Sequence, residues 1–343
     1  MMDDEEPPPW GLASRAVSYN AMSELWKKRK KDMEHIARQA ADDRLEAAHR
    51  AMAQVAHVVL GKDHEIALAF TCLFAKGHLL IEDIPGVGKT TLARAMARAV
   101  GLDFARVQCT SDLLPSDILG ASIYVRDQER FVFHPGAIFS QVVLVDEISR
   151  AGPKTQSALL EAMEEHQVTV DGVSHSLPRP FFVIATQNPV EQLGTYPLPE
   201  SQLDRFLMRM HVGYPDWRVE HQLLERDGNQ ASLDNLEAIL DGNMVLTIQE
   251  DVGTIYAASP VIDYVLSLVT ATRESGAFRL GLSPRAGLAL LRCARAWAWL
   301  AGRSHVLPED VQEVFEPVAA HRLVTAGGQA MAIQELLHSV PVR

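Results

Sequence analysis

The stretch that decides the fold of this chain reads Leu79-Leu80-Ile81-Glu82-Asp83-Ile84-Pro85-Gly86-Val87-Gly88-Lys89-Thr90-Thr91. Its apolar start predicts a short buried strand, and the residues after the second glycine predict the start of a helix. Gly86 and Gly88 have no Cβ, so backbone N–H groups can closely approach phosphate oxygens. The helix N-terminus adds unpaired N–H groups and a partial positive charge. This is the layout of a phosphate-binding P-loop, with Lys89 placed for the β- and γ-phosphates and Thr90 for Mg²⁺.

The P-loop departs from the usual pattern G-x-x-x-x-G-K-[ST] at its first position, where this chain has Asp83. Asp tolerates left-handed backbone better than most residues, so the turn can still form. A carboxylate aimed at a triphosphate would be repelled, so we expect the Asp83 side chain to face away from it. The predicted phosphate-binding residues are Asp83, Ile84, Pro85, Gly86, Val87, Gly88, Lys89, Thr90 and Thr91.

The composition predicts a soluble globular protein, with 47% hydrophobic and 22% charged residues. The formal net charge of −12 argues against a broad nucleic-acid-binding face. Cys72, Cys109 and Cys293 show no paired spacing, which predicts buried thiols in a reducing cytosol. The acidic, Pro-rich start is unlike a signal peptide, and no apolar run reaches membrane-spanning length, so we expect a cytoplasmic protein without membrane insertion.

The N-terminal region is predicted to be an extension, with residues 1–17 disordered and a charged helical pattern from Ser18 to about Val59. It carries one basic patch, Trp26 to Lys31, which suits either nucleic acid or the solvated face of a helix. We place the extension at residues 1–44, a large α/β domain at 45–214 and a smaller helical domain at 215–343.

Two further apolar strands are predicted to end in polar side chains beside the P-loop. The run from Gln141 to Val145 leads into Asp146 and Glu147, and its apolar character indicates a strand buried on both faces. Because ligands bind at the carboxyl ends of parallel strands, Asp146 is expected to orient the Mg²⁺ shell and Glu147 to act as general base on water. A strand at 181–186 is followed by Asn188, which is expected to hold the lytic water or the γ-phosphate.

Two arginines are candidates for contacts with phosphate. Arg205 is out of reach of its own P-loop and is a candidate arginine finger for a neighbouring subunit; the alternative is a salt bridge with Asp204 or a similar residue. Ser283 and Pro284 predict the N-cap and first position of a helix. That helix start aims Arg285 toward a phosphate, unless Arg285 is simply a solvated side chain.

The remaining pattern predicts two hairpins and a helical C-terminal part. One hairpin is expected at about Ala121–His134 and another from Gln167, with the favoured Asp-Gly turn at 171–172. After a hinge near residues 213–216, helices are expected at about 217–226, 249–257, 260–272, 284–300, 308–322 and 329–338. A short apolar run at Val245–Thr247 is set apart from these helices.

These motifs, in this order, resemble those of AAA+ ATPases, and the text between them resembles the MoxR family. The resemblance covers about residues 45–340 and is carried by the runs at 112–117, 146–151, 154–165, 185–189 and 194–200. Ser149 departs from the family pattern, which commonly has Asn there. The resemblance implies ATP and Mg²⁺ as cofactors, an AAA+ P-loop domain with a central parallel sheet and β-hairpin insertions, and a small all-α lid domain.

The resemblance also implies a mechanism and partners. ATP would be hydrolysed at subunit interfaces of a homo-oligomer, a hexameric ring, with Lys89, Glu147, Asn188 and Arg205 as catalytic residues and Arg285 as a phosphate sensor in cis or in trans. MoxR-like proteins resemble chaperones that work with a von Willebrand factor A domain protein on a client protein complex. Three alternatives remain: a nucleic-acid motor, a non-catalytic assembly protein, and a magnesium-chelatase-like subunit. The predicted hairpin at 167–175 has no Lys or Arg, which disfavours nucleic acid.

Overall fold

The computed structural model describes residues 31, 39–189, 194–225, 233, 235–325 and 329–342. The chain separates into two compact units, residues 1–44 and 45–343. The described residues of the first unit, 31 and 39–44, are helical. The disorder expected at residues 1–17 and most of the basic patch, residues 26–30, lie outside the described residues. Among the residues that are described, no helix is long and apolar enough to cross a membrane.

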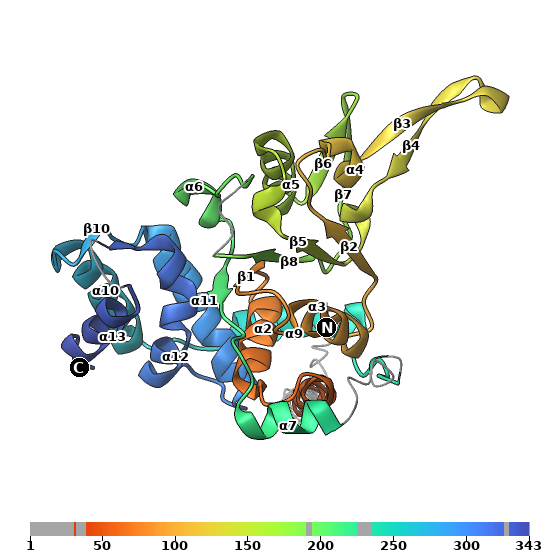
Figure 1. Cartoon of the computed structure of the whole chain (residues 1–343). Helices are drawn as coiled ribbons and strands as arrows, with labels where there is room; N and C mark the ends of the chain where they lie inside the picture. Colours follow the sequence, from red (N-terminus) through yellow and green to blue (C-terminus); the bar gives the residue numbers. More distant parts are fainter. Residues whose placement is uncertain are drawn as a thin grey trace, which may run out of the picture. The chain divides into compact units, whose positions relative to one another are not determined.

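The second unit is built on a five-stranded parallel sheet (Figure 1) with the order β2-β5-β8-β1-β9. Its strands are β2 (Phe104–Gln108), β5 (Val142–Asp146), β8 (Phe182–Gln187), β1 (Leu79–Glu82) and β9 (Met208–Met210). Every residue of β5 is buried, as expected for a central strand between two others. The central parallel sheet predicted from the sequence is confirmed.

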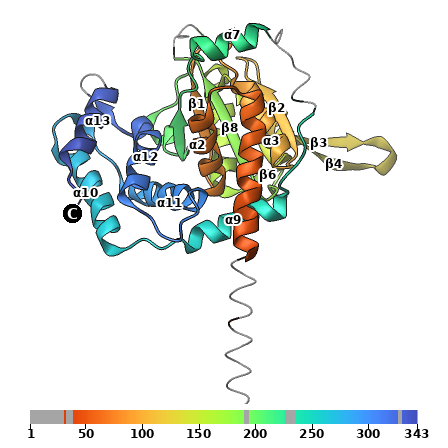
Figure 2. The same ribbon diagram turned by 90° about the horizontal axis from the view of Figure 1, so that it is seen from below.

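Alternate residues along these strands enter two different cores, because successive side chains of a strand point to opposite faces. Leu79 packs with helices α2 (Asp63–Phe74) and α3 (Lys89–Ala99), whereas Leu80 packs with helix α5 (Pro153–Glu165). Figure 1 shows α5 above the sheet with α2 and α3 below it, and Figure 2 shows α2 and α3 in front of the strands when seen from below. The strands therefore lie between two helical layers, and the loops at their ends remain at the edges of the sheet.

Two antiparallel hairpins are inserted into this frame. β3 (Gly120–Val125) pairs with β4 (Arg130–Pro135) and projects away from the sheet (Figures 1 and 2). β6 (Gln167–Val170) pairs with β7 (Val173–Ser176) across residues 171–172, which both have positive φ, 50° and 79°. Both predicted hairpins and the Asp-Gly turn are confirmed, since positive φ at both turn positions is what Asp-Gly favours.

The C-terminal part is mainly helical, as predicted. Its helices are α7 (Trp217–Glu225), α9 (Gly242–Thr254), α10 (Ser259–Glu274), α11 (Pro284–Leu300), α12 (Pro308–Ala319) and α13 (Gln329–Ser339). Among the described residues, short helices also occur as α4 (Pro115–Leu119), α6 (Glu200–Leu203) and the 3₁₀ turns at 126–128, 137–139, 148–150 and 320–322.

Two details of the C-terminal part differ from the sequence prediction. Val245–Thr247 is not separate from the helices but lies inside α9, where Val245, Ile248 and Val252 are buried at helical spacing and Asp241 caps the N-terminus through Met244 N. In addition, β10 (Phe278–Leu280) pairs with β11 (Val324–Thr325) in a small antiparallel ladder. Strands of three and two residues are too short to produce a recognisable alternation in sequence.

Candidate active site

The P-loop connects β1 to α3 with open space over both of its glycines. Gly86 and Gly88 have φ values of +88° and +92°, in the left-handed region, and no heavy atom lies within 4 Å of where a Cβ would stand on either. Gly88 is the N-cap of α3, so the free N–H groups of the first helical turn face the same space. The residues present therefore fit a bound triphosphate, which needs close approach to the backbone.

Lys89 lies back over the loop it belongs to. Its Nζ donates to the carbonyl oxygens of Asp83 at 2.6 Å and Ile84 at 2.8 Å. Burial lowers the pKa of the Lys89 amine, while nearby carboxylates, Asp83 first, oppose that change. The lysine is thus held beside the P-loop by neutral acceptors, which a phosphate could replace.

The Asp83 carboxylate faces away from the phosphate-binding space, as predicted. It is 7% exposed; Oδ1 accepts from Ile84 N at 2.8 Å, and Oδ2 accepts from Val212 N at 2.7 Å and Gly213 N at 2.5 Å. These three bonds tie the start of the P-loop to the segment that follows β9. The aspartate therefore has a structural function that glycine could not supply, which explains the departure from the usual motif.

Asp146 and Thr90 come together as the sequence predicts for a Mg²⁺ site. Thr90 Oγ1 lies 3.4 Å from Asp146 Oδ2, and Thr186 Oγ1 donates to Asp146 Oδ1 at 2.9 Å. The Oδ2 atom also accepts from Arg106, from Nε at 2.8 Å and from a terminal nitrogen at 2.6 Å. Thr90 Oγ1 and the Asp146 carboxylate together fit Mg²⁺, which uses one or two protein ligands and takes its other ligands from phosphates and water.

Glu147 follows directly in a left-handed conformation, with φ of 57°, and its side chain is 31% exposed. Its Oε2 accepts from Arg150 Nε at 2.8 Å and from Gln108 Nε2 at 3.3 Å. Its backbone N–H donates to Thr186 Oγ1 at 2.9 Å. The carboxylate is therefore oriented from two sides yet still open to solvent, as an attacking water requires.

Several of these contacts were not foreseen from the sequence. Arg106 and Gln108 lie on β2, where Gln108 stands opposite Asp146 in the register with β5. The rule that polar side chains at strand ends gather at one edge of the sheet could have found Gln108, because it is the last residue of its strand. Asn188 follows directly after β8, the strand between β5 and β1, and is half-buried.

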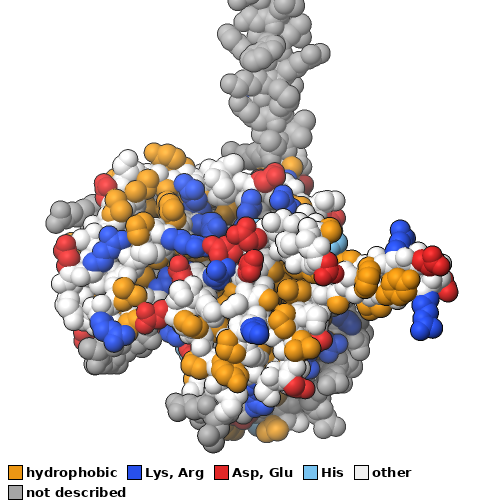
Figure 3. Space-filling view, turned by 90° about the horizontal axis from the view of Figure 1, so that it is seen from above, with side chains coloured by type: hydrophobic (Ala, Val, Ile, Leu, Met, Phe, Trp, Pro, Cys, Tyr) orange, Lys and Arg blue, Asp and Glu red, His pale blue; other side chains and the backbone are white. Residues whose placement is uncertain are grey.

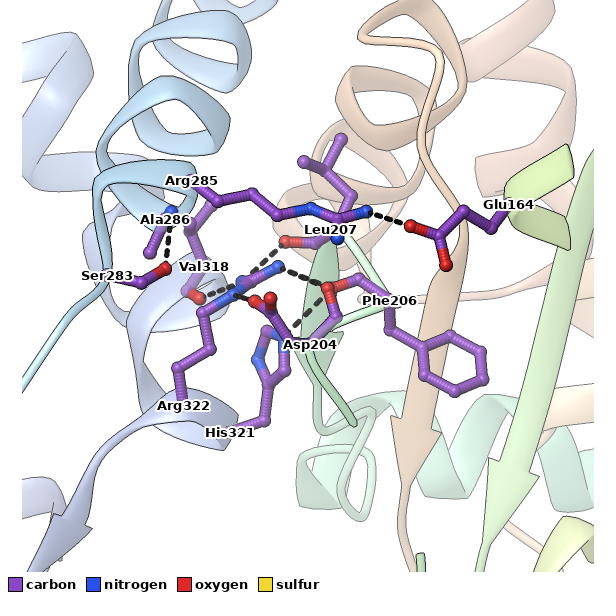
Figure 4. Close-up of polar contacts among 10 residues, drawn as sticks. All are labelled: Glu164, Asp204, Phe206, Leu207, Ser283, Arg285, Ala286, Val318, His321 and Arg322. Carbon is purple, nitrogen blue, oxygen red and sulfur yellow. Dashed lines mark hydrogen bonds and ion pairs between the residues drawn. The ribbon is translucent and has the colours of Figure 1, made fainter. Parts of the chain in front are cut away.

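The two predicted arginines lie near the amino ends of the parallel strands, which we call the amino edge of the sheet. The P-loop lies at the carboxyl ends of the strands, the carboxyl edge. Arg205 precedes β9 and Arg285 begins α11, where Ser283 Oγ caps the helix through Ala286 N at 3.2 Å. Both arginines contact Glu164: Arg205 NH1 reaches Oε2 at 2.5 Å, and Arg285 NH2 reaches Oε1 at 3.1 Å. Figure 4 shows Arg285 extending from the start of α11 to Glu164.

The salt bridge that was the alternative reading of Arg205 is present in this chain, but its partner is Glu164 and not Asp204. Asp204 Oδ1 accepts from Arg322 Nε at 2.6 Å, and Arg322 also donates to backbone oxygens, including that of Phe206 at 2.7 Å (Figure 4). A cavity of about 310 Å³ opens beside Glu164, Arg205 and Arg285. The charged residues that line it are Lys76, Glu164, Asp204, Arg205, Arg285, Arg292 and Arg322.

The length of β1 separates the two sites. The P-loop follows β1 at its carboxyl end, whereas Lys76 and the cationic cavity precede it at its amino end. A strand of four residues spans about 13 Å. Arg205 and the P-loop of the same chain are thus at opposite edges of one sheet.

The comparisons with known proteins agree with this geometry. The family model described as "ATPase family associated with various cellular activities (AAA)" matches residues 78–208, and the AAA lid domain model matches residues 270–338. A crystal structure of a candidate ATPase from Cytophaga hutchinsonii superposes with a TM-score of 0.81 at 35% identity, covering 89% of this chain and 98% of that one. The fold and the matches define a AAA+ ATPase, a class that binds nucleotides.

Relatives narrow the family. Chaperone MoxR1 of Mycobacterium tuberculosis is 40% identical to this chain, and the match covers 80% of this chain and 75% of the relative. Protein MoxR of Methylorubrum extorquens is 34% identical, and the match covers 81% of this chain and 88% of that relative. The uncharacterised protein YeaC of Bacillus subtilis is 44% identical over 85% of this chain and 94% of its own. The chain belongs to the MoxR family of AAA+ ATPases.

Proposed function

We propose that this protein hydrolyses ATP at the interfaces of a homo-oligomeric ring, a hexamer, and uses the cycle to remodel or activate another protein complex. The observation that carries the proposal is the separation of its two chemical sites. The P-loop, Asp146 and Glu147 lie at the carboxyl edge of the sheet, and Arg205 with Arg285 at the amino edge. A complete site then needs the carboxyl edge of one subunit and the amino edge of the next.

The carboxyl edge would bind the nucleotide. Backbone N–H groups of residues 86–91 and the Lys89 amine would hold the phosphates, with Lys89 exchanging its carbonyl partners for phosphate oxygens. Thr90 and Asp146 would hold Mg²⁺, which neutralises charge on the β- and γ-phosphates when bound. Arg106 would have to share or release Asp146 Oδ2 for that purpose.

Glu147 and Asn188 would act on water. Glu147 accepts the proton of a water as it attacks, and its Gln108 and Arg150 contacts hold the carboxylate in place until then. Asn188, at the end of the neighbouring strand β8, would orient that water or the γ-phosphate. From the adjacent subunit, Arg205 would stabilise negative charge on the transferring phosphoryl group and Arg285 would contact the phosphates in trans.

A subunit-mixing experiment tests the shared site. Arg205→Ala should lower turnover by about 10³-fold or more, in line with other arginine fingers, while ATP affinity stays close to wild type. Mixing it with Lys89→Ala subunits, which keep Arg205 but cannot hold phosphate, should restore turnover at junctions between the two variants. Measured ATPase activity in the mixture that is no higher than the sum of the separate variants would contradict the trans assignment.

A protein client is supported by the exposed hairpin. Ile123, Tyr124 and Phe131 on β3 and β4 are 52%, 51% and 69% exposed, and Figure 3 shows hydrophobic side chains along the projecting hairpin. Such apolar surface suits a protein partner, and the β6–β7 hairpin offers no Lys or Arg to a nucleic acid. With the chaperone name of the mycobacterial relative, this supports a chaperone that binds a protein client. The proposal further places it in the cytoplasm, with a von Willebrand factor A domain protein as its partner.

The client can be captured with an ATP-locked trap. Glu147→Gln protein should be added to a lysate of its native cells with ATP and Mg²⁺, and half of the sample treated with nuclease. Retention of a von Willebrand factor A domain protein in both halves is expected. Retention of nucleic acid that is lost with nuclease would replace the chaperone assignment with that of a motor.

A further inference from the structure

Glu164 is a carboxylate that joins the two arginines at the amino edge. It lies in the last turn of α5, and its side chain is 35% exposed. One oxygen takes Arg205 and the other takes Arg285. The two arginines come from different parts of the chain, one before β9 and the other at the start of α11, so Glu164 links the α/β part of the unit to the helical part.

The charge around Glu164 favours this link. Five cations and two carboxylates line the cavity, and Asp204 is engaged by Arg322. Two guanidinium groups this close together repel each other unless a negative charge stands between them. Since Asp204 is used elsewhere, Glu164 is the carboxylate among the described lining residues that offsets Arg205 and Arg285.

The contacts also leave donors available on both arginines. Arg205 uses NH1 for Glu164 and for the Leu160 carbonyl oxygen at 2.8 Å, and Arg285 uses NH2. A guanidinium has five N–H donors in a fixed plane, so each arginine can keep its bond to Glu164 and still bind a phosphate. Glu164 thereby fixes the orientation of both side chains before any phosphate arrives, which reduces the entropy lost on binding.

We propose that Glu164 is a positioning residue that presents Arg205 and Arg285 as one pair to the triphosphate held by the neighbouring subunit. The inference rests on the proposed ring function and adds the residue that couples its two trans-acting cations. Glu164 itself does not contact the nucleotide. Its loss should therefore impair the site of the next subunit and leave the nucleotide site of its own subunit intact.

The test compares Glu164→Gln with Glu165→Gln. The two variants remove the same charge from adjacent positions, but Glu165 is exposed and contributes to neither arginine contact. In rings of one variant, Glu164→Gln should lower kcat by roughly 10- to 100-fold, as expected when a catalytic group is misplaced by about 1 Å. ATP affinity should be unchanged, and Glu165→Gln should match wild type. Glu164→Asp, which keeps the charge, should recover part of the loss.

Mixing then locates the defect. Glu164→Gln subunits mixed with Lys89→Ala subunits should regain turnover, because the intact P-loop of the first is served by the arginines of the second. Arg205→Ala mixed with Lys89→Ala is run in parallel. If Arg205→Ala is restored and Glu164→Gln is not, Glu164 acts within its own site and the inference is overturned alone. If turnover is restored for neither variant, both the trans function and the inference are contradicted. The same holds if Glu164→Gln keeps the wild-type kcat and mixing does not restore the turnover of Arg205→Ala.

Discussion

The two edges of the parallel sheet are built in different ways. At the carboxyl edge, the P-loop and the Asp146-Glu147 pair are continuous runs of sequence at the ends of β1 and β5, the two strands that flank β8. At the amino edge, the cationic cluster is assembled from Glu164, Arg205 and Arg285, which are far apart in the chain. The carboxyl edge is therefore assembled from local motifs, whereas the amino edge is a set of cations held together by a carboxylate.

The two edges also differ in charge: carboxylates and arginines are paired at the carboxyl edge, whereas cations outnumber carboxylates in the cavity at the amino edge. Asp146 and Glu147 are each matched by an arginine of the same subunit, Arg106 and Arg150. The amino edge has more cations than carboxylates in its cavity. On the proposed function, the excess positive charge is matched only when the triphosphate of the next subunit is present.

At the carboxyl edge we expect an effect comparable to that of Arg205→Ala. Glu147→Gln should bind ATP but lower turnover by about 10²–10⁴-fold, because the general base is lost. Unlike Arg205→Ala, it should not be restored by Lys89→Ala subunits, since each variant is then defective in its own carboxyl edge. Steady-state ATPase assays of the mixture measure this, with Glu161→Gln as a control at an exposed acid.

Restoration of Glu147→Gln by Lys89→Ala would mean that the two edges are not divided between cis and trans as proposed. The pair of mixing experiments therefore tests the comparison itself. Variants of opposite edges should complement each other, and variants of the same edge should not.

Sequence reasoning reached the carboxyl edge more completely than the amino edge for a physical reason. A P-loop and a strand ending in two carboxylates are local motifs, so Lys89, Thr90, Asp146 and Glu147 could be named from their neighbours alone. The parallel sheet and both hairpins also followed from local alternation and turn residues. The partner of a side chain at the other edge depends on how α5, β9 and α11 pack together, which no local pattern states.

The same limit applies inside the P-loop. The sequence indicated that Asp83 faces away from phosphate, because like charges repel, but it could not indicate what the carboxylate contacts instead. Its partners at Val212 and Gly213 are more than a hundred residues further along the chain. Arg106 was missed for a similar reason, since its position beside Asp146 depends on the register of β2 with β5.

A smaller effect is expected from the bonds that tie the P-loop to the end of β9. Asp83→Asn keeps the shape of the side chain but replaces one carboxylate oxygen by an NH₂ group, which faces N–H donors. Loss of hydrogen bonds to a charged, buried acceptor should lower the free energy of unfolding by about 1.5–3 kcal/mol. The shift of the urea midpoint measures this, with Asp127→Asn as the control because Asp127 is exposed.

An Asp83→Asn protein as stable as the Asp127→Asn control would show that the three bonds contribute nothing to the fold. Turnover is the second measurement for this variant. Because Asp83 Oδ2 holds the segment after β9, loosening it should change kcat only a few-fold, far less than Glu147→Gln.

The last effect is confined to acid pH and concerns His78, which lines the cavity at the amino edge. His78 Nδ1 accepts from Val183 N at 3.0 Å and Nε2 lies 3.3 Å from the Met163 carbonyl oxygen, and burial lowers the pKa of His78 to about 4. Above pH 6.5 the ring is neutral in both folded and unfolded chains, so it adds no pH dependence. Between pH 6.5 and 4 only the unfolded chain binds the proton, so the free energy of unfolding falls by roughly 1.4 kcal/mol per pH unit as pH decreases.

Replacing the ring in His78→Gln should remove that part of the slope between pH 6.5 and 5. The exposed His134→Gln should keep the wild-type slope, and equal slopes in both variants would mean that His78 can be protonated in the folded protein.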